Sequence, residues 1–435
     1  MADTPSLRIV IIGAGIAGLT TAIALKHHPA IDIDNYERAS ELREIGASIA
    51  LGPNGMRTLD KLGIQNALDE SIAFRNESGH PMIYRHYKTN EVVSTDSHRG
   101  SVEYRHLTSR FYRAHLQQAL LEHVDPSRVH LSKAFHSVSR DVTAGKLLVT
   151  FTDGTNTTAD ILLGADGIHS AVRRSFVATS APTWTGWVAF RSVFPISHVS
   201  HIADLPDEAV HIWGPDRTLF LSRLGKDLFT VVGSSQTDPA AADAPYKDAV
   251  WDTDGDVNVL REYYQDWSPL VRAVVDAVPH TRVYPNTAAH AIDSWVLGDG
   301  RVTLAGDAAH AHGGAFAAGG SLAIDDAWAF AASILEVFPA TTTAPSRIPS
   351  ETDIARALRL YEKTRKEHTD RVLRTVHQGN RKKVARVGKV ETDEELRARM
   401  KSREDPSWIH EHDVEATFLS VLAGEGKRAE EQARL

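Results

Sequence analysis

The segment that most constrains the fold lies at residues 8–25, where an apolar run is followed by Gly13, Gly15 and Gly18. The β-branched residues 9–12 predict a buried strand, and the apolar residues after the glycines predict a helix. In such a strand–turn–helix unit, the first glycine permits the tight turn. The second lets backbone approach a pyrophosphate, and the third lets helix pack on strand. This segment therefore predicts a dinucleotide-binding unit.

An acidic residue stands where this unit needs one. Glu37 follows a predicted second strand at residues 31–36 and lies 19 residues past Gly18. A parallel strand there would present the carboxylate to a ribose hydroxyl. The amino terminus of the preceding helix would supply unpaired N–H groups and partial positive charge to the phosphates. The alternative is a glycine-rich corner without a ligand, and the position of Glu37 argues against it.

A second segment, at residues 301–320, also combines a carboxylate with glycines. An apolar strand pattern leads into Gly306 and Asp307, and a glycine-rich loop follows at residues 312–320. We expect a helix from Ser321 toward Phe338, with its amino terminus facing the same pocket as Asp307. A ligand with polyol hydroxyls and an anionic end suits both groups, as do the ribityl chain and reduced ring of a flavin. The alternative is that Asp307 only caps a helix.

Three motifs occur in order along the chain. They are the glycine turn with Glu37, residues 164–173 (GADGIHSAVR) and residues 306–310 (GDAAH). This order resembles the class A flavoprotein aromatic monooxygenases, the family of para-hydroxybenzoate hydroxylase and salicylate hydroxylase, to about residue 380. The loop HGGAFAAGG at residues 312–320 departs from the family, which often has a proline shortly after the GDAAH histidine. In this respect the chain looks more like the fungal salicylate and polyketide-phenol hydroxylases.

The resemblance implies an α/β fold with a Rossmann-type parallel-sheet domain that binds FAD. An antiparallel-sheet substrate domain is inserted into it, and a helical tail ends the chain. Short strands and turns across residues 181–288, and a hairpin at residues 83–95, agree with the inserted sheet. The tail is charged, with Trp408 and Ile409 as docking points. The expected boundaries are 1–75, 101–180 and 281–385 for the FAD domain, 76–100 and 181–280 for the substrate domain, and 386–435 for the tail.

The resemblance also implies which residues hold FAD. Arg113 matches an arginine at the start of a helix that approaches the FAD phosphates. Asp166 and Arg173 belong to the motif linked to both FAD and the pyridine nucleotide. Only one GxGxxG is present, so NADPH or NADH is expected to bind transiently, reduce FAD and leave. The expected cofactor-binding residues are Gly13, Gly15, Ala17, Gly18, Glu37, Arg38, Arg43, Gly46, Ala47, Arg113, Asp166, Gly306, Asp307, Gly319 and Gly320.

The implied reaction is hydroxylation of a phenolic ring by a flavin C4a-hydroperoxide formed from reduced FAD and dioxygen. A free phenol has a pKa of about 10, so a cation or a base is needed at neutral pH. Arg191, on a predicted strand beside aromatic residues, is the expected cation. The alternative is an arginine paired to an acid on the sheet surface. His211, His310 and His312 are the alternative proton acceptors. The expected substrate-binding residues are Trp187, Arg191, Trp213 and Phe316.

Several alternatives remain beside this prediction. Salicylate, hydroxylated with loss of its carboxylate, is the leading substrate, and a polyketide-derived resorcinol hydroxylated with loss of aromaticity is the second. A non-catalytic flavin-binding regulator and an NAD-dependent dehydrogenase are the competing classes. A metal site at Asp307, His310 and His312 is disfavoured, because the flavin motifs explain that segment better, and no metal is expected.

Composition sets the remaining limits. The chain has 435 residues and no cysteine, which excludes disulfides and thiolate metal sites. Its net charge of −8 gives no basic surface for nucleic acid. No uninterrupted apolar run reaches the roughly 18 residues that span a bilayer. We expect a cytoplasmic monomer or homodimer acting on a phenolic small molecule without a membrane. The terminal Ala433-Arg434-Leu435 leaves a peroxisomal location open.

Overall fold

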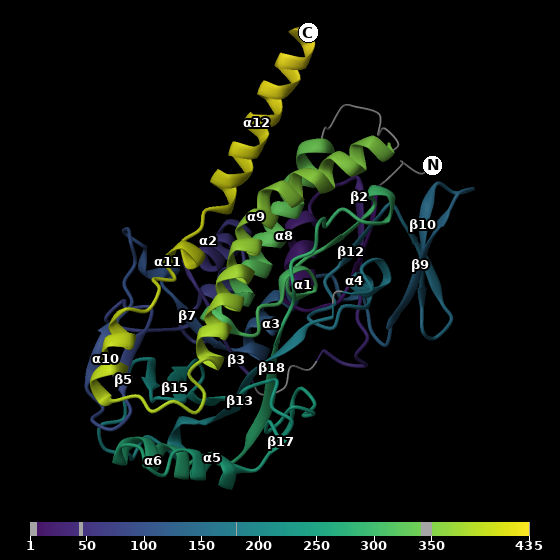
Figure 1. Cartoon of the computed structure of the whole chain (residues 1–435). Coiled ribbons are helices and arrows are strands. Elements are labelled where there is room, and N and C mark those ends of the chain that lie inside the picture. Colours follow the sequence, from purple (N-terminus) through teal and green to yellow (C-terminus); the bar gives the residue numbers. More distant parts are fainter. Residues whose placement is uncertain (1–6, 43–46, 180, 341–349, 435) are drawn as a thin grey trace.

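The computed structural model describes residues 7–42, 47–179, 181–340 and 350–434 (Figure 1). A five-stranded sheet lies at the core of the larger lobe, in the order β19-β12-β1-β2-β8, with every neighbouring pair parallel. The predicted strand–helix–strand unit and its parallel register are confirmed. The strands are β1 (Leu7–Ile12), β2 (Ile31–Tyr36), β8 (Val129–His130), β12 (Ile161–Gly164) and β19 (Val302–Leu304).

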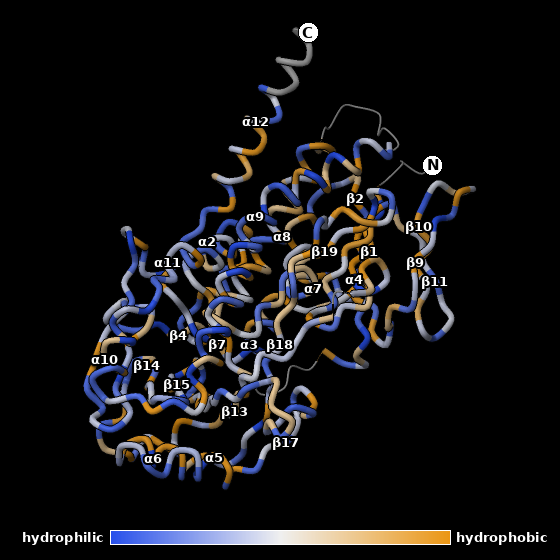
Figure 2. The backbone as a smooth tube through the Cα atoms, in the orientation of Figure 1, coloured by the Kyte–Doolittle hydropathy of each residue, from blue (hydrophilic) through white to orange (hydrophobic). Residues whose placement is uncertain are grey.

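Helices cover this sheet, so its central strands are buried on both faces. Helix α1 (Ile16–Leu25) packs against α8 (Gly319–Val337) and α3 (Arg113–Leu121), and α8 packs against α9 (Glu351–Val384). Figure 2 shows hydrophobic residues gathered around β1 and β19. An antiparallel sheet of β9 (Phe135–Asp141), β10 (Lys146–Phe151) and β11 (Asn156–Ala159) projects from one side (Figure 1).

The second lobe is an eight-stranded sheet in the order β17-β18-β13-β16-β15-β14-β5-β6. Its neighbours are antiparallel except β14 and β5, which run parallel. The predicted hairpin at residues 83–95 is confirmed as β5 and β6. The strands are β5 (Ile83–His86), β6 (Val92–Thr95), β13 (Thr183–Pro195), β14 (Val210–Trp213), β15 (Arg217–Leu224), β16 (Leu228–Gln236), β17 (Thr253–Gly255) and β18 (Thr281–Ala288).

The expectation of antiparallel sheet throughout residues 181–288 was wrong in part. Two helices, α5 (Val257–Tyr263) and α6 (Pro269–Asp276), lie in that range and cover one face of the sheet. Helix α6 has a serine cap at Ser268, a proline at its first position and apolar residues at helical spacing, a pattern that predicts a helix. Strands of the two large sheets alternate along the sequence. The domain boundaries expected from the sequence remain a proposal.

The two lobes are joined by a small antiparallel sheet and by the carboxyl-terminal segment. The small sheet contains β3 (Ser48–Leu51), β7 (Ser109–Tyr112) and β4 (Phe74–Arg75), and α2 (Pro53–Lys61) follows β3. The carboxyl-terminal segment contains α10 (Asp393–Lys401), α11 (Ser407–His410) and α12 (Val414–Arg434). Among the described helices, none is long and apolar enough to cross a membrane.

The docking points predicted in the tail are confirmed at α11. Ile409 is buried in a cluster with Leu322, Val372 and Val376, and Trp408 packs against the same cluster. The guanidinium of Arg371 lies 3.9 Å from the centroid of the Trp408 ring. The tail is thereby fixed to α8 and α9, and α10 contacts β6 of the second lobe.

A buried polar network connects α8 and α9 to the end of β19. The Asp326 carboxylate accepts hydrogen bonds from Arg365 at 2.8 Å and from the Gly306 backbone N–H at 2.8 Å. It also lies 2.6 Å from His310 Nε2. Burial alone would raise the pKa of Asp326, but the charges of His310 and Arg365 outweigh it and hold that pKa below its usual value. This network positions the Gly306-Asp307 turn.

Replacing Asp326 with alanine is expected to lower the free energy of unfolding by about 3–5 kcal/mol, because Arg365 would be left as a buried cation without its partner. Denaturant unfolding followed by circular dichroism measures this. Asp254→Ala is the control, since that side chain is 94% exposed in its ion pair with Arg282 and should change stability little. Equal effects of the two substitutions would contradict the role given to Asp326.

Candidate active site

One cavity extends from the glycine turn to the second lobe. Its volume is about 1360 Å³, larger than the roughly 300–1,000 Å³ of most small-molecule pockets. Among the described residues predicted for the site, all but Gly18, Arg173 and His310 line it. They are Gly13, Gly15, Ala17, Glu37, Arg38, Ala47, Arg113, Asp166, Trp187, Arg191, His211, Trp213, Gly306, Asp307, His312, Phe316, Gly319 and Gly320. The predicted residues Arg43 and Gly46 lie outside the described residues.

The three glycines of the first turn have different roles. A Cβ on Gly13 (φ +107°) would lie 2.3 Å from the Ala165 carbonyl oxygen, and a Cβ on Gly18 would lie 2.0 Å from the Gly13 carbonyl oxygen. These two positions therefore need glycine for packing, the role expected for Gly18, which does not itself line the cavity. A Cβ on Gly15 would meet nothing within 4 Å. Gly15 instead keeps the cavity wall at the amino end of α1 open.

Glu37 holds this turn from the end of β2. Its carboxylate accepts the backbone N–H of Ala14 at 2.9 Å and that of Ala39 at 3.0 Å. A carboxylate has about four lone-pair positions, so it retains acceptor capacity toward the cavity. Arg113 begins α3, as predicted, and also lines the cavity.

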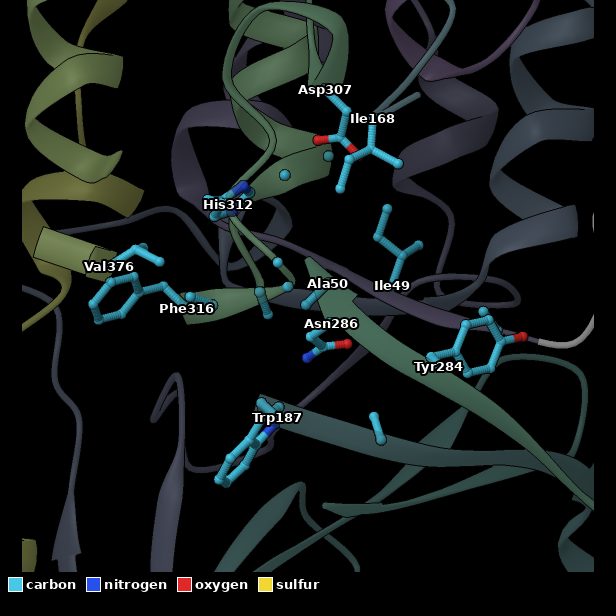
Figure 3. Close-up of a pocket in the computed structure, with 18 of the residues that line it drawn as sticks. Ile49, Ala50, Ile168, Trp187, Tyr284, Asn286, Asp307, His312, Phe316 and Val376 are labelled. Carbon is cyan, nitrogen blue, oxygen red and sulfur yellow. The ribbon is translucent and has the colours of Figure 1, made fainter. Parts of the chain in front are cut away.

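Asp307 is the exposed residue of an otherwise buried turn. Residues 302–306 and 308–311 are buried around it. Gly306 has φ +60°, and a Cβ there would lie 3.1 Å from Ala17 Cβ. Figure 3 shows the Asp307 carboxylate at the cavity beside Ile168, with His312 nearby. The turn thus presents one carboxylate to a ligand that would extend from Gly15.

The motif at residues 164–173 lines the cavity in part and also organises the start of a helix. The Asp166 carboxylate accepts hydrogen bonds from the Ala171 and Val172 N–H groups at the start of α4 (Ala171–Phe176). Burial raises the pKa of Asp166 in spite of these bonds. Arg173 does not line the cavity. It is buried and donates to the carbonyl oxygens of Ala309 and His290, and its link to a nucleotide stays a prediction.

The loop at residues 312–320 has a strained backbone. Phe316 (φ +58°) and Ala317 (φ +52°) adopt the left-handed region without being glycine, a conformation that costs of order 1–3 kcal/mol each and clusters at functional sites. Phe316 packs against the cluster that contains Val376 and Ile409. Figure 3 shows Phe316 and Val376 side by side at one edge of the cavity. The carboxyl-terminal segment therefore helps to hold this loop in place.

His312 is buried at the base of this loop. Neither of its ring nitrogens has a hydrogen-bond partner among the described residues. Burial lowers the pKa of His312, although the Asp307 charge opposes it, so the ring is neutral at pH 7. His310, the third histidine considered, binds Asp326 and does not line the cavity. It is therefore a structural residue and not a proton acceptor for a ligand.

The eight-stranded sheet presents alternate residues to the cavity, as the period of a strand requires. On β13 these are Trp187, Ala189 and Arg191, while Val188 and Phe190 face the core beneath α5 and α6. The same alternation places the predicted residues His211 and Trp213 of β14 on the cavity face. Tyr284 and Asn286 of β18 also lie on this face and were not predicted.

Arg191 is the cation of this face. Its guanidinium carbon lies 5.0 Å from the Tyr284 ring centroid, and its Nε has no hydrogen-bond partner. A Cβ on Gly314 would lie 3.3 Å from an Arg191 nitrogen, so the loop approaches the guanidinium closely at this glycine. Burial lowers the pKa of Arg191, but arginine stays charged at neutral pH. Within the described residues it forms no ion pair with an acid, against the alternative of a surface pair.

His211 lies deeper in the second lobe, with ring centroids 5.8 Å from Trp213 and 5.9 Å from Tyr84. Burial, together with the charges of Lys383 and Arg403, lowers the pKa of His211 to about 3. Such a group is a weak base at neutral pH. These cations come from the end of α9 and from the segment after α10, which the sequence prediction did not connect with the site.

The polar groups that line this cavity fit FAD. The open wall at Gly15 and the amino end of α1 suit a diphosphate, and the Asp307 carboxylate suits the ribityl hydroxyls. Within the described part of the chain, no group of three or more histidine and acidic side chains could hold a metal ion.

Replacing Asp307 with alanine should weaken FAD binding by about 10- to 100-fold, the range for loss of a hydrogen bond to a charged group. The measurement is a titration of the apoprotein with FAD, followed by flavin fluorescence. Asp293→Ala serves as the control, because Asp293 is exposed outside the cavity. An unchanged FAD dissociation constant in Asp307→Ala would rule out the proposed contact.

Comparison with known proteins agrees with this site. Residues 6–348 match the model of the FAD binding domain family. The chain is 28% identical to the 6-hydroxynicotinate 3-monooxygenase of Bordetella bronchiseptica, over 97% of this chain and 98% of that protein. It is 27% identical to the salicylate hydroxylase of Pseudomonas putida, over 100% and 98% of the two chains.

The fold agrees as well. A salicylate hydroxylase substrate complex superposes with a TM-score of 0.76 at 22% identity, covering 96% of this chain and 98% of that chain. At this identity the likeness supports the fold, and the family match supports the cofactor. The chain therefore belongs to the FAD binding domain family, as a flavoprotein of the class A aromatic monooxygenase type.

Proposed function

We propose that the chain is an FAD-dependent, NAD(P)H-consuming hydroxylase that adds one oxygen atom of dioxygen to a phenolic ring. The observation that supports this most is Arg191, a desolvated cation on the cavity face of β13 with no acidic partner among the described residues. The two relatives named above act on 6-hydroxynicotinate and salicylate, both hydroxylated aromatic acids. A phenolate is an anion of matching shape for the region around Arg191.

Arg191 would lower the pKa of a phenol bound beside it, because an opposite charge in a site of low dielectric favours the ionised form. The phenolate is the more electron-rich ring and hence the better acceptor of electrophilic oxygen. Trp187 and Tyr284 would flank a flat ring, and Phe316 would limit the access of water from the loop side.

FAD, when bound along Gly15 and Asp307, would supply the oxidation chemistry with NAD(P)H and dioxygen. His312 would contribute a neutral ring beside Asp307 that can exchange a hydrogen bond with a ligand hydroxyl. His211 lies among cations, and we assign it to the substrate wall and not to proton transfer.

The substrate need not be a single small ring. The cavity continues past Trp187 to residues of α9 and α10, which favours the second candidate, a larger polyketide-derived phenol, over salicylate itself. Both candidates require the same contact with Arg191.

A panel of phenols with and without carboxylates tests the proposed reaction. NAD(P)H oxidation and product mass are measured together, and the expected result is phenol-stimulated oxidation with a product heavier by one oxygen atom. A flavin-binding regulator would bind FAD but show no such stimulation. An NAD-dependent dehydrogenase would turn over without flavin.

Arg191→Met is expected to spare FAD binding and to lower kcat/KM for the phenol by about 10- to 100-fold, as for loss of a charge-assisted contact. Its kcat/KM should also rise more steeply with pH than that of the parent, since the phenol would need hydroxide to ionise. Steady-state rates across a pH series measure both effects.

Arg223→Met is the matched control, because Arg223 lies on β15 of the same sheet and pairs with Asp207 away from the cavity. If the pH profile of Arg191→Met equalled that of the parent, Arg191 would not stabilise the phenolate.

A further inference from the structure

The far end of the cavity is cationic. Lys383 at the end of α9, Arg386 two residues after that helix, and Arg399 on α10 line the cavity near Trp187 and Trp213. None of these cations was predicted for the site, and neither the glycine turn nor Asp307 accounts for them. They lie beyond the aromatic residues that would hold the reacting ring.

Arg399 is neutralised by a neighbour. Its Nε and one terminal nitrogen each lie 2.7 Å from the Glu391 carboxylate, and its guanidinium carbon lies 5.3 Å from the Trp213 ring centroid. Among the described residues, neither Lys383 nor Arg386 forms an ion pair with an acid. Two cations that line this end of the cavity therefore lack an acidic ion-pair partner within the described part of the chain.

Lys383 is the more desolvated of the two. Its Nζ lies 4.4 Å from the Trp187 ring centroid, a cation–π contact. Burial, with the charges of Arg386 and Arg399 nearby, lowers the pKa of Lys383 to about 8. A buried cation normally has a counter-charge, because removing it from water is costly otherwise. An anion is thus the group that this end of the cavity lacks.

The separation from Arg191 limits what this anion can be. Trp187 and Arg191 are four residues apart on the same face of β13, which is about 13 Å along a strand. One benzoate is too short to contact both ends. The aromatic residues Trp187 and Trp213 suit the apolar part of an organic acid better than a bare inorganic ion.

We propose that Lys383 and Arg386 form an anion subsite, which binds a carboxylate carried by the aromatic substrate at a distance from its phenolic ring. This inference rests on the proposed function and specifies the substrate class: a phenol with an acidic side arm or second ring, anchored at both ends of the cavity. In this arrangement Arg191 binds the phenolate, and Lys383 and Arg386 bind the carboxylate.

Matched acids and esters test the subsite in the FAD-loaded protein. The probes are para-hydroxybenzoate and para-coumarate, each with its methyl ester, and the change in the flavin absorption spectrum reports binding. We expect the parent to bind para-coumarate more tightly than its ester. Lys383→Met and Arg386→Met should each weaken binding of the acid by about 10- to 100-fold and leave binding of the ester within about twofold. The shorter acid should be affected less.

Lys389→Met is the control, since Lys389 is an exposed lysine of the same segment outside the cavity. It should leave the acid-to-ester ratio unchanged. A pyridine-nucleotide phosphate is the other anion with this chemistry, and KM values for NADPH and NADH distinguish it. Loss of NADPH binding alone in the variants would overturn the assignment to the substrate.

The preference for acid over ester should also depend on pH. Lys383 is charged below its pKa of about 8, so the preference should be present at pH 6–7 and fall as the pH rises through that value. Two neighbouring groups keep their charge state in this range: Arg386 stays cationic, as arginine does at these pH values, and burial keeps His211 neutral. In Lys383→Met the preference should no longer change with pH in this range.

An acid-to-ester ratio of one in the parent, or an equal ratio in parent and variants, would overturn the subsite. Such a result with phenol-stimulated NAD(P)H oxidation intact would leave the proposed function standing. A different result would contradict the proposed function but still support the subsite. In that case no phenol would stimulate NAD(P)H oxidation, yet the acid would bind tightly and its binding would depend on Lys383.

Discussion

The pairing of three parallel strands positions everything else in the site. Strand β1 pairs with β12 so that Ile12 lies opposite Gly164, and Gly164 lies opposite Leu304 of β19. Because the carboxyl ends of parallel strands meet at one edge, the turns that follow these residues converge. Gly13, Ala165 and Gly306 are thereby brought together from positions nearly 300 residues apart in the chain. The close contact of Gly13 with Ala165 shows how little space this arrangement leaves.

The second lobe depends on a simpler constraint, the alternation of side chains along a strand. One face of the eight-stranded sheet packs on α5 and α6 and takes the apolar residues. The other face must then take the intervening residues, which include Trp187, Arg191 and His211. The cofactor region and the aromatic region share one cavity, because the loop at residues 312–320 joins the end of β19 to α8 directly above that face.

Local patterns predicted the parts of the site that local physics determines. The glycine spacing and the acid after β2 depend on a few neighbouring residues, and both were predicted from them, whereas the start of α3 at Arg113 came from the family resemblance. Arg173 and His310 were assigned to ligands although their side chains bind backbone carbonyls and Asp326, partners that only the folded chain brings near. The cations Lys383 and Arg386 gave no signal, because a charged helix end is normally solvated. Their place in the cavity depends on the way the tail folds back over β6.

The central claim is that one extended FAD lies between the glycine turn and the Asp307 turn. The most direct measurement is a titration of the purified chain with FAD, in which bound flavin is determined by absorbance after removal of the free cofactor. The account predicts saturation at one FAD per chain, with a perturbed flavin spectrum. A folded protein that stays colourless in excess FAD would contradict it.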